Sequence, residues 1–168
     1  STKLRRGASF KKFKGYIVAG MGGSHLSADL IKVWRPDFPL IVWTNYGLPP
    51  MPKKELKERL LISSSYSGNT EEAISALVAA KKNKIPAAVA ASGGRLIQLA
   101  KKNKIPYVEM PDLHIQPRLA LGQSLKALFV LMGEKGVLHK IGELAKTLRP
   151  ARQERQGEIL ARALRGSI

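Results

Sequence analysis

Short apolar runs alternate along most of the chain with segments whose apolar residues repeat at helical spacing. The runs cover residues 16–19, 40–44, 60–62, 87–91 and 107–110. They are rich in aliphatic residues, and their lengths suit buried strands. Strands that alternate with helices are typical of a parallel sheet with right-handed crossovers. The pattern therefore predicts an α/β fold in which a five-stranded parallel sheet is flanked by helices.

The segments between the runs predict amphipathic helices. One is expected from about His25 to Trp34. Another follows Asn69, which can cap it, and Glu72 stands where it would complete a capping box. A longer helix is expected from Pro117, because proline is favoured in the first turn of a helix. Each helix would cover one face of the sheet and leave its N-terminus at the edge where a strand ends.

The run that ends near Ser65 leads into a turn rich in hydroxyl side chains. Ser65, Ser67 and Thr70 surround Gly68, and a helix pattern begins directly afterwards. The first turn of a helix presents unpaired N–H groups and the positive end of the helix dipole. Together with hydroxyl donors, this is typical of a phosphate-monoester site. The alternative interpretation is a serine-rich turn with an ordinary helix cap.

A glycine-rich turn, Gly20-Met21-Gly22-Gly23-Ser24, follows the first predicted strand. Its glycines let the backbone approach a ligand closely. A dinucleotide-binding loop is excluded, because that loop needs another glycine spacing and an acidic residue after the second strand. The chain has Thr44-Asn45 there. Since Ser92-Gly93-Gly94 also follows a strand, these turns are expected to converge at one edge of the sheet.

Four segments in order resemble a known family. Ser-Tyr-Ser-Gly-Asn-Thr-Glu-Glu at residues 65–72 resembles the phosphosugar signature of sugar isomerase (SIS) domains, and most of all that of bifunctional phosphoglucose/phosphomannose isomerases. Residues 20–24, 92–94 and 116–118 match the other pieces of that pattern. The resemblance runs from about residue 14 to about residue 136 and concerns the N-terminal half of those isomerases. It implies a flavodoxin-like three-layer sandwich.

The resemblance also implies roles for individual residues and a reaction. The expected phosphate ligands are Ser65, Ser67, Thr70 and Ser24; the expected sugar contacts are Gly22, Gly23, Ser92 and Gly93; and the expected catalytic residue is Arg118. For Arg118 the alternative is a structural arginine on a surface helix. The implied reaction interconverts glucose 6-phosphate or mannose 6-phosphate with fructose 6-phosphate.

The base for that reaction is not found in the sequence. In the resembling family, the proton-transfer glutamate, a histidine and a lysine come from a second domain, and His25, His114 and His139 do not match that motif. His25 and His114 could still face the site. We therefore expect an enzyme part that binds a hexose 6-phosphate and needs a second half or a second copy for catalysis. The alternative is a non-catalytic phosphosugar sensor or regulatory module.

The C-terminal segment has a different pattern from the rest. Residues 1–136 contain all the predicted strands and are expected to form the SIS domain, whereas residues 137–168 contain only helical patterns. Their apolar stripes need burial. We expect this segment either to link to a second SIS domain that this sequence does not contain or to mediate a homodimer.

Composition limits the remaining classes of function. The 168 residues carry a formal net charge of +17 and no cysteine, which excludes disulfides and thiolate metal sites. The sequence predicts no metal, no cofactor and no membrane span, and it is compatible with a cytoplasmic location. The charge favours anionic ligands. Many lysines, however, stand at predicted helix ends without interleaved aromatic residues, so nucleic acid is not the expected partner.

Overall fold

The structure, a computed structural model, describes residues 3–5 and 13–165. These residues divide into two compact units, residues 1–135 and 136–168, and each is described by itself. The first unit contains a sheet in the order β1-β6-β5-β4-β2-β3. Five of its strands are parallel: β2 (Gly15–Ala19), β3 (Leu40–Trp43), β4 (Arg59–Ser65), β5 (Ala87–Ala91) and β6 (Tyr107–Glu109). The predicted parallel sheet is confirmed.

One strand of the sheet was not predicted. β1 (Lys3–Arg5) pairs antiparallel with β6 at the edge of the sheet, with Leu4 opposite Val108. A strand of three residues is too short to show an alternating pattern, and its pairing partner lies far away in the sequence. It adds one edge strand to the parallel sheet and leaves the order of the other strands unchanged.

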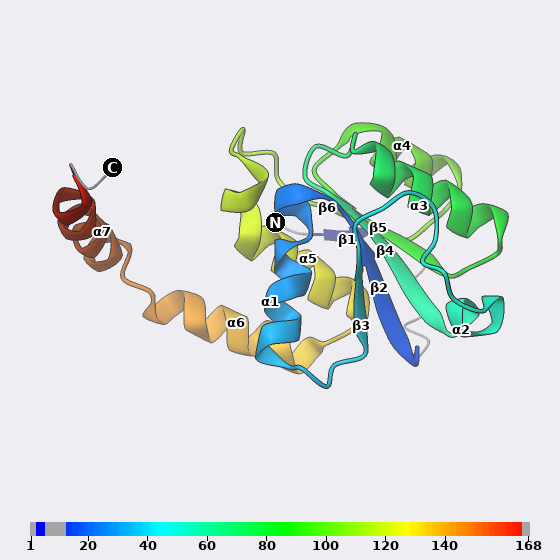
Figure 1. Cartoon of the computed structure of the whole chain (residues 1–168), viewed down its shortest axis with the longest axis horizontal. Helices are drawn as coiled ribbons and strands as arrows, with labels where there is room; N and C mark the ends of the chain where they lie inside the picture. The colour runs from blue at the N-terminus through cyan, green and yellow to red at the C-terminus, as the bar shows by residue number, and fades with distance from the viewer. Residues whose placement is uncertain (1–2, 6–12, 166–168) are drawn as a thin grey trace. The chain divides into compact units, whose positions relative to one another are not determined.

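Helices cover both faces of the sheet, which gives the expected three layers (Figure 1). On one face, α1 (Leu26–Trp34) packs against α5 (Leu121–Met132), and α5 packs against β4, β5 and β6. On the other face lie α2 (Lys53–Lys57), α3 (Glu71–Lys82) and α4 (Gly94–Lys102). Short 3₁₀ turns, η1 (Gly22–Ser24) and η2 (Pro117–Ala120), precede α1 and α5. The helix expected from Pro117 therefore begins with a tighter turn.

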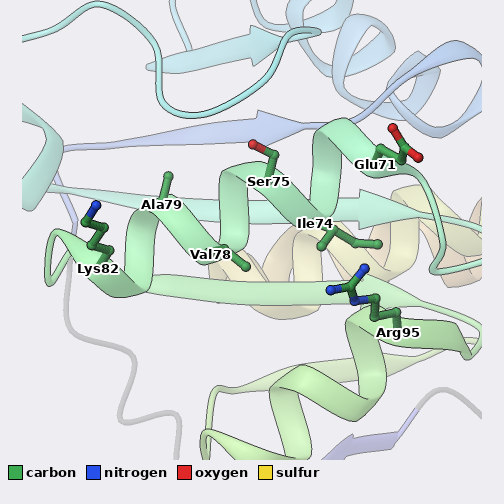
Figure 2. Close-up of a pocket in the computed structure, with 7 residues that line it drawn as sticks. All are labelled: Glu71, Ile74, Ser75, Val78, Ala79, Lys82 and Arg95. Atoms are coloured by element: carbon green, nitrogen blue, oxygen red, sulfur yellow. The ribbon is translucent and has the colours of Figure 1, made fainter.

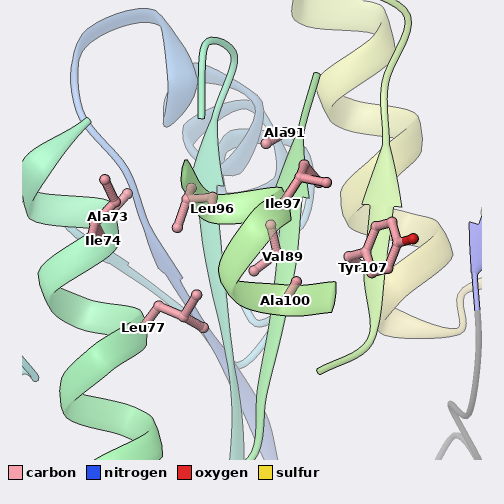
Figure 3. Close-up of a cluster of buried hydrophobic side chains, with 9 residues drawn as sticks. All are labelled: Ala73, Ile74, Leu77, Val89, Ala91, Leu96, Ile97, Ala100 and Tyr107. Atoms are coloured by element: carbon pink, nitrogen blue, oxygen red, sulfur yellow. The ribbon is translucent and has the colours of Figure 1, made fainter. Parts of the chain in front are cut away.

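The core beneath α3 and α4 consists of small and branched aliphatic side chains together with Tyr107 (Figure 3). The strand β5 contributes Val89 and Ala91, both fully buried. Small residues on a central strand let the helices approach the sheet closely, and interiors pack to nearly crystalline density. The remaining members of the cluster are Ala73, Ile74, Leu77, Leu96, Ile97, Ala100 and Tyr107. This packing fixes the first turns of α3 and α4, where two of the predicted site loops end.

The strand order contains one reversal. The strand β2 lies between β3 and β4, so the chain moves outward to β3 and then returns to the other side of β2. Ligands in open α/β sheets bind where the strand order reverses, outside the carboxyl ends of the strands. In this chain, that position is flanked by the glycine-rich turn after β2 and the hydroxyl-rich turn after β4.

The second unit contains helix α7 (Pro150–Leu164) and nearly all of α6 (Lys135–Thr147). Both helices were predicted. Apolar side chains on each helix remain exposed: Leu144 and Leu148 in and directly after α6, and Ile159, Leu160 and Leu164 in α7. None of the helices in the described ranges is both long enough and apolar enough to cross a membrane.

Candidate functional site

The turn after β4, residues 65–70, has a rigid inner side. Ser65 is fully buried, and its Oγ accepts a hydrogen bond from the N–H of Gly68 at 3.1 Å. The same Oγ lies 2.8 Å from Oγ1 of Thr70, with which it shares a second hydrogen bond. Gly68 has a φ of +73°, a left-handed conformation that suits glycine. The Ser65 hydroxyl therefore holds the turn closed from within.

The outer side of this turn presents open donors. Ser67 is exposed, and its Oγ accepts from the N–H of Asn69 at 3.3 Å, while its own O–H donates to no acceptor among the described residues. For the backbone N–H groups of Ser67 and Thr70, no acceptor exists within the part of the chain that the structure describes. Thr70 is the N-cap of the twelve-residue helix α3, and its side chain makes no capping hydrogen bond. The turn is thus suited to an anion.

The capping box predicted for Asn69 and Glu72 is not formed. The helix begins one residue later than that box requires, with Thr70 rather than Asn69 as its N-cap. Oδ1 of Asn69 instead accepts a hydrogen bond from the N–H of Arg95, at 3.0 Å, in the first turn of α4. The asparagine therefore joins two loops. A contact with a residue so distant in the sequence leaves no local pattern.

The loop after β5, residues 92–94, lies in backbone contact with the turn after β4. A Cβ added to Gly68 would stand 1.9 Å from the carbonyl oxygen of Gly93, and one added to Gly94 would stand 2.4 Å from that of Ser67. The carbonyl of Gly68 accepts from the N–H of Leu96 at 2.9 Å. Two positions thus require glycine because two loops touch through their backbones.

The glycine-rich turn after β2 lies beside the same turn. Oγ of Ser24 accepts from the N–H of Tyr66 at 3.1 Å, and Ser24 is only 5% exposed. Gly22 is left-handed, with a φ of +53°. A Cβ added to Gly23 would stand 2.6 Å from the backbone nitrogen of Arg118. The turn therefore contacts both the turn after β4 and the segment that carries Arg118.

Arg118 lies at the same edge of the sheet, in η2, which packs against η1. Its side chain is exposed, and it forms no ion pair with any residue of the described ranges. An arginine that no carboxylate neutralises, close to a turn with open donors, adds to the positive potential of this edge.

A polar pocket of about 380 Å³ opens between three of these loops. Its volume lies within the range of small-molecule sites. The residues that line it come from the loops after β4, β5 and β6: Tyr66, Ser67, Asn69, Ser92, Gly93, Gly94, Asp112, His114 and Ile115. Hydroxyl, amide and carboxylate groups make up most of this set, as a ligand with several hydroxyl groups requires.

Comparison with known proteins agrees with the family resemblance found in the sequence. No protein-family model matches the chain. A curated relative from Caldicellulosiruptor bescii, a bifunctional phosphoglucose/phosphomannose isomerase, is 33% identical over 150 residues, which cover 85% of this chain and 43% of the relative. The enzyme of the same name from Pyrobaculum aerophilum is 37% identical over 131 residues, covering 75% of this chain and 40% of the relative. The chain resembles the N-terminal half of these isomerases. It spans about two fifths of the length of the relatives it matches.

The chain is thus similar in sequence to bifunctional isomerases, while a solved structure supports the fold. The Vibrio vulnificus NanR protein complexed with ManNAc-6P has a TM-score of 0.54 and 18% identity. The alignment covers 82% of this chain and 57% of that protein. At this level of identity the likeness concerns the fold, and it agrees with the α/β architecture predicted for a SIS domain.

The structure groups the residues predicted from the isomerase resemblance in two ways. Ser67, Ser92 and Gly93 line the polar pocket. Six others lie at the same edge of the sheet but do not line this pocket: Ser24, Ser65, Thr70, Gly22, Gly23 and Arg118. Tyr66, Asn69 and Asp112 were not predicted as site residues. Tyr66 stands between Ser65 and Ser67, so its position within the signature was the one available signal.

The histidines and acids supply no obvious base. Nδ1 of His25 shares a hydrogen bond with Oδ2 of Asp29 at 2.5 Å. The side chain of His114 is 90% exposed, with its Nδ1 3.7 Å from Oδ2 of Asp112. His139 belongs to α6. Among the described residues, no group of three or more histidines and acids is placed to hold a metal ion.

A second pocket, of about 430 Å³, lies along the outer face of α3 (Figure 2). It has an apolar floor and charged ends: Glu71, Ile74, Ser75, Val78, Ala79, Lys82 and Arg95. The hydroxyl of Tyr46 donates to Oε2 of Glu71 at 3.2 Å, and this hydrogen bond raises the pKa of Tyr46. None of the predicted site residues lines this pocket. The carboxyl edge of the sheet is therefore the candidate site.

Proposed function

We propose that the chain binds a hexose 6-phosphate and forms the phosphosugar-binding part of an isomerase. The proposed reaction interconverts glucose 6-phosphate or mannose 6-phosphate with fructose 6-phosphate. The observation that carries the proposal is the turn of residues 65–70, which presents two open backbone N–H groups and a free hydroxyl at the N-terminus of α3. The names of the curated relatives support the choice of substrate.

In this proposal the phosphate contacts the outer side of the turn. Ser67 donates through its N–H and its hydroxyl. If Ser65 donates its proton to Thr70, the Thr70 hydroxyl keeps its own proton for the phosphate, because each hydroxyl has one proton to give. Oγ of Ser24 accepts from Tyr66 and likewise retains a proton that can be donated. Ser24 and Ser65 thus act from the buried side of the turn, and Ser67 and Thr70 from the open side.

The remaining predicted residues surround the sugar. Ser92 and Gly93 line the polar pocket next to Ser67. A Cβ added to Gly22 would meet no atom within 4 Å, so a ligand could approach the backbone there, whereas the backbone of Arg118 fills the space beside Gly23. Arg118 would supply positive charge at the reacting end of the sugar. The net charge of +17 favours the arrival of an anionic substrate.

Isomerisation also needs a base that moves a proton between two carbons through an enediol. Two acids near the site have other contacts. Glu71 accepts from Tyr46, and Asp112 accepts from the N–H of His114 at 3.0 Å. We therefore place the base on a second half or on a second copy of the chain, as the isomerase resemblance implies.

For assembly we propose a homodimer that buries the apolar stripes of α6 and α7. The side chains of Leu144, Leu148, Ile159, Leu160 and Leu164 are each more than half exposed. Amphipathic helices gain stability when such stripes are covered, and a two-fold dimer covers both stripes at once. Light scattering at high micromolar concentration should give twice the monomer mass. A monodisperse monomer would contradict this assembly.

The proposed function is tested by calorimetry with fructose 6-phosphate beside an isomerase assay. The chain should bind the ligand and turn it over slowly or not at all without a second half. Replacing Ser67 or Thr70 with alanine removes one donor to a dianion, which is worth roughly 1.5–3 kcal/mol, or about ten- to a hundredfold in affinity. Thr147→Ala is the matched control, because it removes a hydroxyl from exposed α6. Full affinity in both turn variants would show that the turn is merely a helix cap.

A further inference from the structure

Tyr66 contacts the loops that follow three other strands. Its N–H donates to Oγ of Ser24 in the turn after β2. Its carbonyl accepts from the N–H of Ser92 at 3.0 Å, and from the Ser92 hydroxyl, in the loop after β5. Its phenolic oxygen lies among Asp112 and Leu113 in the loop after β6. One residue of the turn after β4 thus joins the loops at the carboxyl edge.

The phenolic hydroxyl uses both of its hydrogen-bonding roles in a buried place. It accepts from the N–H of Leu113 at 3.0 Å and donates to Oδ1 of Asp112 at 3.4 Å. Tyr66 is only 6% exposed. Oδ1 of Asp112 also accepts from the N–H of His114, so the three groups form one small network. Buried polar networks of this kind fix a local conformation when each member is paired.

Among the described residues, no backbone–backbone hydrogen bond holds the loop of residues 111–114. Residues 111–114 are exposed, and His114 has a φ of +53°, a left-handed conformation unfavourable for a residue with a side chain. The loop nevertheless places His114 and Ile115 in the lining of the 380 Å³ pocket. We expect the hydrogen bonds to the Tyr66 hydroxyl to maintain that placement.

We propose that the 380 Å³ pocket receives the polyol part of the sugar phosphate and that the Tyr66 hydroxyl positions its wall, so that the phosphate turn and the loop after β6 act as one unit. This inference rests on the proposed function. The pocket offers the hydroxyls of Ser67 and Ser92, the amide of Asn69 and the carboxylate of Asp112. Ser67 and Asn69 can donate to and accept from sugar hydroxyls, whereas Asp112 and Ser92, whose proton goes to the Tyr66 carbonyl, can accept from them. Tyr66 is in this view a positioning residue.

The inference predicts different effects on the binding of two ligands. Inorganic phosphate needs only the donors of the turn, whereas fructose 6-phosphate needs the turn and the placed loop. Tyr66→Phe removes the hydroxyl and leaves the backbone contacts of residue 66 in place. By titration calorimetry, we expect the affinity for fructose 6-phosphate to fall about tenfold and that for inorganic phosphate to change less than about twofold. Tyr107→Phe is the matched control: Tyr107 is buried in β6, and its hydroxyl makes no hydrogen bond with the described residues.

Amide hydrogen exchange gives a second readout. Fructose 6-phosphate should slow the exchange of the Leu113 amide in the native chain and leave it unchanged in Tyr66→Phe, because the link between turn and loop is then lost. If Tyr66→Phe lost affinity equally for both ligands, Tyr66 would only support the turn, and the inference would be overturned. Unchanged affinity for both ligands would overturn it as well. A native chain that binds inorganic phosphate but not fructose 6-phosphate overturns the polyol pocket alone. A native chain that binds neither ligand overturns the proposed function and this inference with it.

Discussion

The loops at the two edges of the sheet pair their backbone N–H and C=O groups in different ways. At the amino edge, the chain passes from α3 into β5 and from α4 into β6, and the carbonyl groups at each helix end accept hydrogen bonds from neighbours in sequence. At the carboxyl edge, the turns satisfy their groups through other loops and leave donors open. The first arrangement serves stability, whereas the second leaves room for a ligand.

The amino edge contains the same hexapeptide twice, Lys-Lys-Asn-Lys-Ile-Pro at residues 81–86 and 101–106. Both copies have the same conformation. Nδ2 of Asn83 donates to the carbonyl of Ala79 at 2.9 Å, and Nδ2 of Asn103 donates to that of Leu99 at 2.8 Å. Lys84 and Lys104 are both left-handed, with a φ of 56°. Identical local sequence gives identical helix ends, which indicates that local interactions determine these two helix ends.

The carboxyl edge depends instead on contacts between residues distant in sequence. Asn69 caps α4 rather than its own helix, and Gly68 faces Gly93 across two loops. A substitution at this edge should therefore disturb several loops and the ligand together. A substitution at the amino edge should change only the free energy of unfolding.

The largest effect is expected from Gly68→Ala. The new Cβ would stand 1.9 Å from the Gly93 carbonyl oxygen at a φ of +73°, so two loops must move apart. We expect a loss of about 2–5 kcal/mol in unfolding free energy, and loss of measurable sugar-phosphate binding. Urea denaturation and calorimetry measure the two effects. Gly122→Ala is the control, because that Cβ would meet no atom within 4 Å and the helix should gain slightly. Native-like binding by Gly68→Ala would contradict the close approach of the loops.

The next effect distinguishes two asparagines. Asn69→Ala removes the acceptor for Arg95 in the first turn of α4, and Asn83→Ala removes the donor to Ala79 at the end of α3. Each should cost about 1 kcal/mol of unfolding free energy. Affinity for fructose 6-phosphate should fall only in Asn69→Ala, since that residue lines the pocket. Equal affinities in the two variants would remove the functional difference between the edges.

Tyr16→Phe tests a hydrogen bond at the amino edge through the pH dependence of stability. The Tyr16 hydroxyl donates to the carbonyl of Met132 at 3.0 Å, and its loss should cost about 1 kcal/mol below pH 10. Burial, and secondly the charge of Glu134, raise the pKa of Tyr16 above 10.0. The unfolded chain therefore loses this proton first, and the native protein loses stability as pH rises through the raised pKa. The difference in unfolding free energy between the native protein and Tyr16→Phe, measured from denaturation curves, should become smaller above pH 10. A constant difference would contradict the raised pKa.

The smallest effect is expected where the lysines are left-handed. Lys84→Gly and Lys104→Gly relieve an unfavourable φ of 56° but increase the entropy of the unfolded chain. Since the first term is the larger, we expect each to raise the unfolding free energy by about 0.5 kcal/mol without a change in ligand affinity. Thermal denaturation of the double variant gives the sum. A loss of stability would show that the lysine side chains hold the helix ends.

The same contrast explains how far the sequence could predict the molecule. The parallel strands and the helices around them follow from local periodicity, which is why all five parallel strands were found. The convergence of Ser24, Ser65 and the loop of residues 92–94 follows from the rule that parallel strands end at one edge. The roles of Asn69 and Tyr66 could not be predicted, because their partners lie in other loops. The strand β1 was missed for the same reason.

The reversal in strand order also has a consequence for the order of folding. The strands β4, β5 and β6 are joined by single helices, so their pairing closes short loops. The strand β2 reaches β4 only after the chain has passed through α1, β3 and α2, and long loop closure slows such pairing. We therefore expect the turn after β4 to gain its partner Ser24 late in folding, when β2 joins β4. Substitutions in this turn should accordingly speed unfolding more than they slow folding.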